Sequence, residues 1–105
     1  MGRSQEELER AFEETRELFV AFGDTYRQEI ILILGKNRSM TVKELSETLQ
    51  LSRPATSHHI KILKNAGLLG ERREGVRRYY YPTLKEPFKK VKQLIEAASD
   101  VIESE

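Results

Sequence analysis

Cysteine and tryptophan are both absent from this 105-residue sequence. Without cysteine the chain cannot form a disulfide, a thiolate metal site, a thiol redox sensor or a cysteine nucleophile. The longest apolar run, at residues 30–34, is far shorter than the roughly 20 residues of a membrane-spanning helix. The charged first residues also lack the apolar stretch of a signal peptide. We therefore expect a soluble, cytoplasmic protein that does not bind a membrane.

The charge of the chain is unevenly distributed. The formal net charge is only +1, but residues 1–23 carry three basic and six acidic groups, a net charge of −3. Residues 52–78 carry seven basic and two acidic groups, a net charge of +5. A basic segment of this kind favours an anionic partner. The length predicts one domain, 1–105, and with only 38% apolar residues we expect it to gain stability from a partner chain.

Capping residues and apolar spacing predict a mainly α fold with one small β-hairpin, in the order α-α-α-α-β-β-α. Residues 30–34 are expected to be buried nearly all round, and residues 35–39 to form a loop. Glu74 and Gly75 fit the hairpin turn. The expected helices are 4–22, 25–34, 42–49, 53–66 and 84–105, the last with Pro87 near its start, and the expected strands are 68–73 and 76–81.

Two short capped helices, a tight turn between them and a basic hairpin after them form the pattern of a helix-turn-helix with a wing. At 100° per residue, the second helix turns Thr56, His59 and Ile60 toward the core and His58 and Lys61 to the outside. We interpret His59 as a packed, hydrogen-bonded histidine. The predicted DNA-binding residues are Arg53, Pro54, Thr56, Ser57, His58, Lys61, Lys64, Arg72, Arg73, Arg77 and Arg78.

The first and last helices carry apolar stripes that step by three and four residues. We interpret these stripes as a dimer interface, although the phenylalanines could instead line a small-molecule pocket. The predicted interface residues are Leu8, Phe12, Phe19, Phe22, Phe88, Val91, Ile95, Ala98 and Ile102.

From Gly23 to about Leu84 the sequence resembles the ArsR/SmtB winged-helix repressors. The matching strings are Gly23–Arg27, Thr41–Leu49, Ser52–Leu63, Ala66–Leu69, Arg72–Gly75 and Tyr79–Tyr80. The resemblance implies a homodimer joined by residues 1–23 and 84–105, with a DNA-binding core at 24–83. It also implies that Arg53, Ser57 and His58 contact operator DNA.

Members of that family commonly release DNA on binding a metal, but this chain lacks the matching ligands. Thr41, Val42 and Lys43 stand where the family's sensor helix carries cysteine. The last helix offers only acidic groups, Glu96, Asp100, Glu103 and Glu105. The two histidines are adjacent in one helix, so they point to different faces and cannot chelate together. We predict no metal site, no cofactor and no thiol sensing, and leave a small-molecule or protein inducer open.

Other functions have weaker support in the sequence. A winged-helix module that docks an acidic protein would ignore DNA, and a regulator with a non-standard metal or small-ligand site would respond to that ligand. The three consecutive tyrosines, residues 79–81, could form a stacking platform for single strands. However, alternate residues of a strand face opposite sides, so at least one tyrosine should be buried. We expect no enzyme, since no nucleophile and base occur at readable spacing.

Overall fold

The computed structural model describes residues 4–103, which form an elongated molecule of 53 × 24 × 21 Å. The elements are α1 (Gln5–Phe22), α2 (Thr25–Asn37), α3 (Val42–Leu49), α4 (Arg53–Asn65), β1 (Leu69–Glu74), β2 (Arg77–Pro82) and α5 (Lys85–Glu103). The expected order of elements is confirmed. Glu105 and the outermost residues of the predicted 1–105 domain lie outside the described residues.

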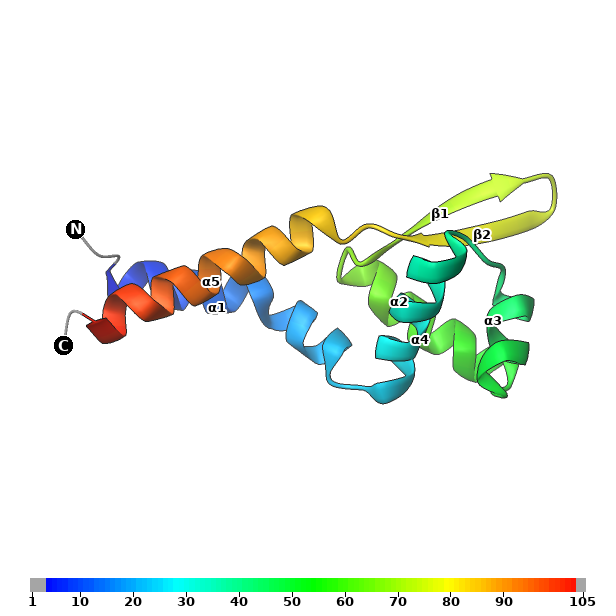
Figure 1. Cartoon of the computed structure of the whole chain (residues 1–105), viewed down its shortest axis with the longest axis horizontal. Coiled ribbons are helices and arrows are strands. Elements are labelled where there is room, and N and C mark those ends of the chain that lie inside the picture. The colour runs from blue at the N-terminus through cyan, green and yellow to red at the C-terminus, as the bar shows by residue number, and fades with distance from the viewer. Residues whose placement is uncertain (1–3, 104–105) are drawn as a thin grey trace.

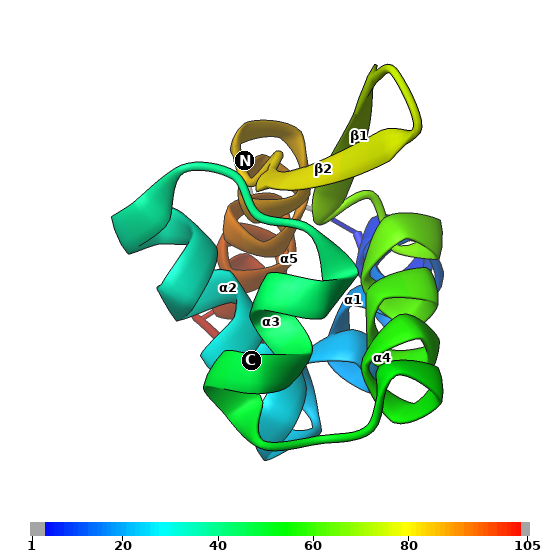
Figure 2. The ribbon, with the colours of Figure 1, turned by 90° about the vertical axis from the view of Figure 1, so that its right-hand side faces the viewer.

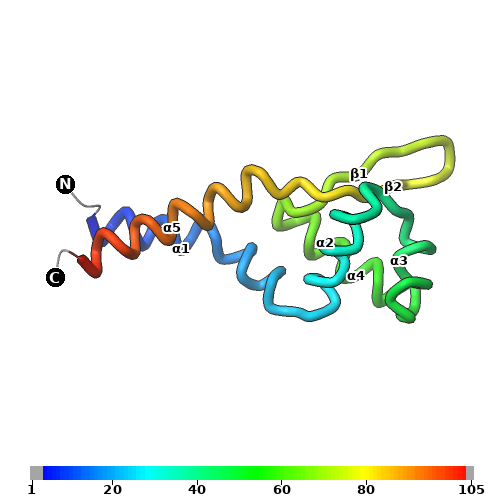
Figure 3. Tube along the Cα trace, in the orientation of Figure 1, coloured from blue at the N-terminus to red at the C-terminus, as the bar shows by residue number. Residues whose placement is uncertain are grey.

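Helices α1 and α5 lie side by side at one end of the long axis, and the other elements gather at the opposite end (Figure 1). The start of α1 and the end of α5 lie together at the far tip of this helix pair (Figure 3). Residues 24–83 therefore form a body of α2, α3, α4 and the hairpin, which we call the winged body. No helix within residues 4–103 has the length and apolar character needed to cross a bilayer.

Local capping interactions explain where the first four helices begin. The predicted caps Ser4, Asp24, Thr41 and Ser52 each accept a backbone hydrogen bond from the residue three positions later. At α3 the arrangement is reciprocal, because the Glu44 carboxylate accepts a hydrogen bond from the Thr41 backbone N–H at 3.0 Å. These starts were predictable because the cap and its partner are neighbours in sequence.

The expectation of a loop at residues 35–39 is wrong for residues 35–37, since α2 continues to Asn37, and only residues 38 and 39 lie outside the helix. The Asn37 side chain donates to the Ile33 carbonyl at 2.9 Å, and Arg38 ends the helix with a φ of 73°. The expected all-round burial of residues 30–34 is also wrong. Ile30 and Leu34 are buried, but Leu32 is 68% exposed because neighbouring elements cover only one side of α2.

The hairpin turn lies one residue later than expected. Glu74 pairs with Arg77, so Gly75 and Val76 form the two-residue loop. Gly75 has a φ of +62°, and a glycine with positive φ at the first central position suits a type II′ turn. Near the base of the hairpin, a Cβ at Gly70 would lie 2.6 Å from Cζ of Tyr81, so the ring lies across the glycine.

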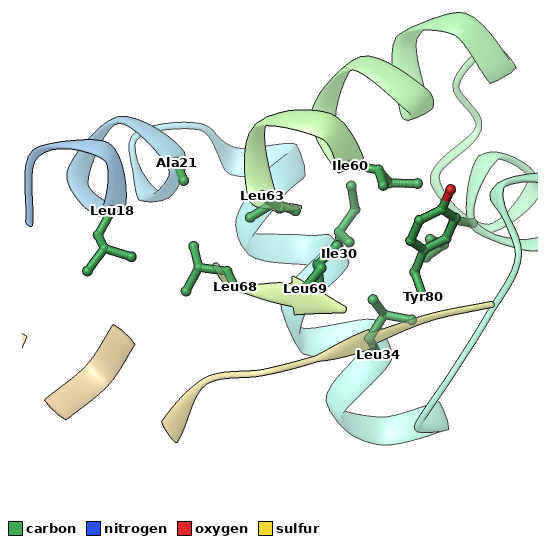
Figure 4. Packing of buried hydrophobic residues seen from close by; sticks show 10 residues of the cluster. Leu18, Ala21, Ile30, Leu34, Ile60, Leu63, Leu68, Leu69 and Tyr80 are labelled. Atoms are coloured by element: carbon green, nitrogen blue, oxygen red, sulfur yellow. The ribbon is translucent and has the colours of Figure 1, made fainter. Parts of the chain in front are cut away.

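The core joins the helix pair to the winged body. Leu18 and Ala21 of α1, Ile30 and Leu34 of α2 and Ile60 and Leu63 of α4 meet Leu68, Leu69 and Tyr80 from the start of the hairpin and from β2 (Figure 4). Leu45 adds α3 to this cluster. Burial of these side chains holds α3 and α4 against the hairpin, which sets the geometry of the basic surface.

The capping box of α3 generates a stability prediction. Thr41→Ala removes the hydroxyl that accepts from Glu44 N at 3.2 Å and donates to Glu44 Oε1 at 3.0 Å. We expect a loss of about 1 kcal/mol in the free energy of unfolding, the usual cost of deleting a cap. Urea unfolding at pH 7 measures it, and an unchanged midpoint would contradict it.

The pH dependence of Glu44 gives an independent check of the same box. Hydrogen bonds from the backbone and side chain of Thr41 hold the pKa of Glu44 below its ordinary value, with a further contribution from the charge of Arg77. A carboxylate with a depressed pKa stabilises the fold at neutral pH and loses that effect as pH falls through its folded pKa. Glu44→Gln should therefore have a lower free energy of unfolding than the wild type at pH 7, and this difference should disappear at acidic pH. Glu47→Gln is the control on the same helix.

Candidate nucleic-acid interface

One face of α4 is open to solvent and carries the predicted base-reading residues. Arg53 and Pro54 open the helix, and Ser57, His58 and Lys61 follow on exposed positions. Viewed along the long axis, α4 lies beside α3, and the hairpin projects above both helices (Figure 2). The exposed face offers guanidinium, hydroxyl, imidazole and ammonium groups, which can bind base edges and phosphates.

Thr56 was wrongly included among the DNA-binding residues. Its side chain is fully buried, and its Oγ1 donates to the Ser52 carbonyl at 2.9 Å. The position of Thr56 on the core side of α4 leaves no path to a duplex. Its role is to close the first turn of the helix that carries Ser57 and His58.

A groove of about 770 Å³ separates the helix-turn-helix from the hairpin. Arg53 and Ser57 line it from α4, Arg77 and Arg78 line it from β2, and Glu44 lines it from α3. Three guanidinium groups therefore border one groove beside the first turn of α4. A phosphate backbone fits this arrangement, because Arg binds phosphate oxygens through its planar fork of donors.

The register of the hairpin separates its arginines onto two faces. Cross-strand partners share a face, and Leu69 and Tyr80 are buried, so their face packs on the core. Further toward the tip, the same face carries Arg73 directly opposite Arg78. Like charges in this position repel each other in the free protein. A polyanion between the hairpin and α4 would relieve that repulsion.

The opposite face of the hairpin binds its own arginines. Arg72 Nε lies 3.1 Å from Glu74 Oε1, and its guanidinium lies 5.2 Å from the ring centre of Tyr79. A hydrogen bond with Tyr79, and then the charge of Glu44, raise the pKa of Arg77 above its ordinary value. Tyr79 therefore contacts both Arg72 and Arg77. Tyr81 covers Gly70, and Tyr80 is buried, which confirms the expectation that at least one of the three tyrosines would be.

Lys64 links α4 to the hairpin. Its Nζ lies 2.9 Å from Glu71 Oε1 on β1. The hydrogen bond from Lys64, followed by its charge and that of Arg78, holds the pKa of Glu71 below its ordinary value despite an opposing contribution from burial. Lys64 was predicted as a phosphate contact, but a phosphate would compete with Glu71 for its ammonium group.

His59 is packed and hydrogen-bonded, as its place on the apolar side of the helix indicated. The side chain is 14% exposed, and Nδ1 lies 3.1 Å from Arg27 Nη1 and 3.8 Å from Asp24 Oδ1. Burial opposes ionisation of Asp24, but a hydrogen bond from the Arg27 backbone and the charge of Arg27 lower its pKa. Sequence reasoning assigned no contact to Arg27, although Arg27 ends the Gly23–Arg27 string that resembles the family and lies three residues after the cap Asp24.

The helix pair carries a broad apolar surface. Phe12, Phe19, Phe88, Ile95 and Ile102 are each at least 45% exposed. The other predicted interface residues, Leu8, Phe22, Val91 and Ala98, are half-buried, and the rings of Phe22 and Phe88 lie 5.7 Å apart within the chain. The apolar stripes read from the sequence included neither Val20, which is exposed, nor the four residues of α1 and α5 that are buried, Leu18, Ala21, Leu94 and Ala97.

These features define a winged helix-turn-helix DNA-binding protein. A family model described as bacterial regulatory protein, arsR family, matches residues 24–70. The chain is 41% identical over 70 residues to the uncharacterized HTH-type transcriptional regulator MJ1325 of Methanocaldococcus jannaschii, covering 67% of this chain and 79% of that protein. It is 36% identical over 63 residues to the transcriptional repressor SdpR of Bacillus subtilis (strain 168), covering 60% and 69%.

A crystal structure of an ArsR family transcriptional regulator superposes with a TM-score of 0.73 at 25% identity, covering 100% of this chain and 99% of that chain. The chain belongs to the ArsR family, and it is a DNA-binding transcriptional regulator rather than an enzyme. Among residues 4–103, no group of three or more His, Asp or Glu side chains is placed to hold a metal ion.

The two faces of the hairpin should differ in their contribution to DNA binding. Replacing Arg78 by Ala should weaken binding to all duplexes and reduce the slope of log K against log salt by up to about one unit. Arg72→Ala should change the slope less, since Glu74 and Tyr79 already engage that guanidinium. Fluorescence anisotropy at several salt concentrations measures both. Equal slopes for the two variants would refute the assignment of faces.

Proposed function

We propose that this chain is a homodimeric repressor that binds an imperfectly palindromic operator. The observation that carries the proposal is the pairing of a groove lined by Arg53, Arg77 and Arg78 with a separate apolar face on α1 and α5. The groove supplies phosphate and base contacts. The apolar face supplies a contact between two copies, which doubles the DNA surface.

In the proposed complex, each α4 enters a major groove and each wing lies on the flank. The side chains that read base edges are Ser57 and His58, and Arg53, Lys61, Arg73 and Arg78 bind phosphates. Two-fold symmetry of the dimer sets half-sites about 10 base pairs apart, or a multiple of that distance. A bound dimer blocks other proteins from the same duplex, which is the simplest route to repression.

We also propose that the regulator senses neither metal nor thiol oxidation and acts in the cytoplasm. The chain has no cysteine, and both of its histidines lie in α4, where His59 is engaged by Arg27. The acidic residues at the end of α5 offer only carboxylate oxygens, which suit Mg²⁺, Ca²⁺ or Mn²⁺ better than the metals that prefer imidazole or thiolate ligands. A small organic ligand or a partner protein remains the candidate inducer.

Base reading by Ser57 and His58 can be separated from phosphate binding. The double variant Ser57→Ala, His58→Ala should lose most of the preference for operator over random duplex and keep its affinity for random duplex, since each base contact contributes about 1–3 kcal/mol of discrimination. Lys61→Ala is the matched control and should weaken both duplexes alike. Competition binding at fixed salt distinguishes the two, and equal losses for the double variant would exclude base reading.

Dimerisation through the helix pair predicts a change in mass. Ile95→Glu places a charge on the apolar face of α5, and burying an unpaired charge in an interface is strongly unfavourable. We expect this variant to have the mass of one chain in light scattering, where the wild type has the mass of two. Leu32→Glu is the control, because Leu32 is as exposed as the interface residues but lies on α2. A dimeric Ile95→Glu would place the interface elsewhere.

A further inference from the structure

Two short connections join the helix pair to the winged body. Only Gly23 and Asp24 separate α1 from α2, and the chain turns there from the long axis of the molecule into α2, which runs across that axis (Figure 1). On the other side, Thr83 and Leu84 connect β2 to α5. The angle at which a dimer presents its two α4 helices depends on these two connections and on the packing of Leu18 and Ala21 of α1 in the core.

One arginine spans the first connection. Arg27 Nε donates to the Ala21 carbonyl at 2.9 Å, and Arg27 Nη2 donates to the Val20 carbonyl at 3.0 Å, so the guanidinium caps the end of α1. The remaining nitrogen, Nη1, lies 3.1 Å from His59 Nδ1 on α4. Arg has donors only, so Nδ1 accepts and the ring proton lies on Nε2. Three donors of one planar group thus bind α1 and α4 at the same time.

The partner side chain on α4 is well fixed. His59 is largely buried, and its ring lies 5.8 Å from the ring of Tyr26 on α2. It directly follows His58, which faces solvent on the proposed base-reading surface. A bond to His59 therefore acts on the turn of α4 that meets the DNA.

The second connection is held by a different residue. Thr83 donates from its backbone N–H to the Leu68 carbonyl at 2.9 Å and from Oγ1 to the Gly67 carbonyl at 2.7 Å. These bonds tie the segment before α5 to the segment after α4. The Thr83 bonds therefore fix the last residue of the winged body before α5. On the α1 side, by contrast, a side chain, that of Arg27, binds a helix of the pair and α4 together.

We propose that Arg27, acting through His59, is the positioning residue that sets the angle of the recognition helix relative to the dimer-forming helix pair. The inference rests on the proposed homodimer. It assigns to Arg27 a role in selecting half-site spacing, without any contact to DNA. Lys cannot replace it, because a single ammonium cannot present three donors in a plane.

The test uses the palindromic duplex that the wild-type protein selects from a random pool, together with versions in which the half-sites are one base pair closer or farther apart. One base pair moves a half-site by about 3.4 Å and turns it by about 35°. The wild type should lose at least about tenfold in affinity on the altered duplexes, the cost of losing one or two base contacts. Arg27→Met and His59→Leu should reduce this penalty at least threefold while binding a single half-site as the wild type does.

Two matched variants separate positioning from general stability. Gln28→Met removes the hydrogen bond from Gln28 Nε2 to the Phe22 carbonyl at 2.6 Å, which also caps α1 but does not reach α4. His59→Asn keeps an acceptor close to the position of Nδ1. Both should retain the wild-type spacing penalty. His59→Leu leaves the two hydrogen bonds from Arg27 to α1 in place, so this variant tests the positioning role even if Arg27→Met fails to fold.

The outcomes are distinct. A relaxed penalty in Gln28→Met, or an unchanged penalty in His59→Leu, overturns the positioning role. A wild type that is monomeric in sedimentation, or that selects no palindrome, overturns the proposed homodimer and this inference together. A dimeric wild type with the same penalty in every variant overturns the inference alone.

Discussion

The placement of the wing depends on Tyr80. Its backbone N–H donates to the Met40 carbonyl at 2.8 Å and its carbonyl accepts from Met40 N at 3.1 Å, so β2 is bound to the segment that leads into α3. Its ring is buried in the core with Leu34 and Leu63. The strand that carries Arg77 and Arg78 is therefore fixed by main-chain bonds and by packing. Without this anchor, a two-stranded hairpin would be only marginally ordered.

The sequence predicted what neighbouring residues determine. Helix starts at Asp24, Thr41 and Ser52 depend on partners three positions away, and the exposed face of α4 follows from helical period. The end of α2 and the exposure of Leu32 depend on which elements pack nearby, and the pattern of that segment carries no such information. The contact between Arg27 and His59 joins residues 32 positions apart. Only the assembled fold brings them together.

The net charge of the chain is small, but its acidic and basic groups are concentrated in different parts of the molecule. The acidic α1 lies in the helix pair, and the basic segment 52–78 forms α4 and the hairpin at the other end of a 53 Å molecule. A field of this polarity directs a polyanion to the winged body, and in the proposed dimer the apolar faces of α1 and α5 make the contact between the two copies. Within the winged body, the carboxylates of Glu71 and Glu74 form ion pairs with Lys64 and Arg72.

The apposition of Arg73 and Arg78 has a thermodynamic consequence. In the proposed complex, the phosphates of a bound duplex would reduce the repulsion between these two guanidinium groups, which lie directly opposite each other on the hairpin. The duplex then behaves as a stabilising ligand of the fold, since anything that binds the native state shifts the unfolding equilibrium. Thermal stability and occupancy of the operator are linked quantities in this protein, and inorganic anions at high concentration would imitate part of the effect.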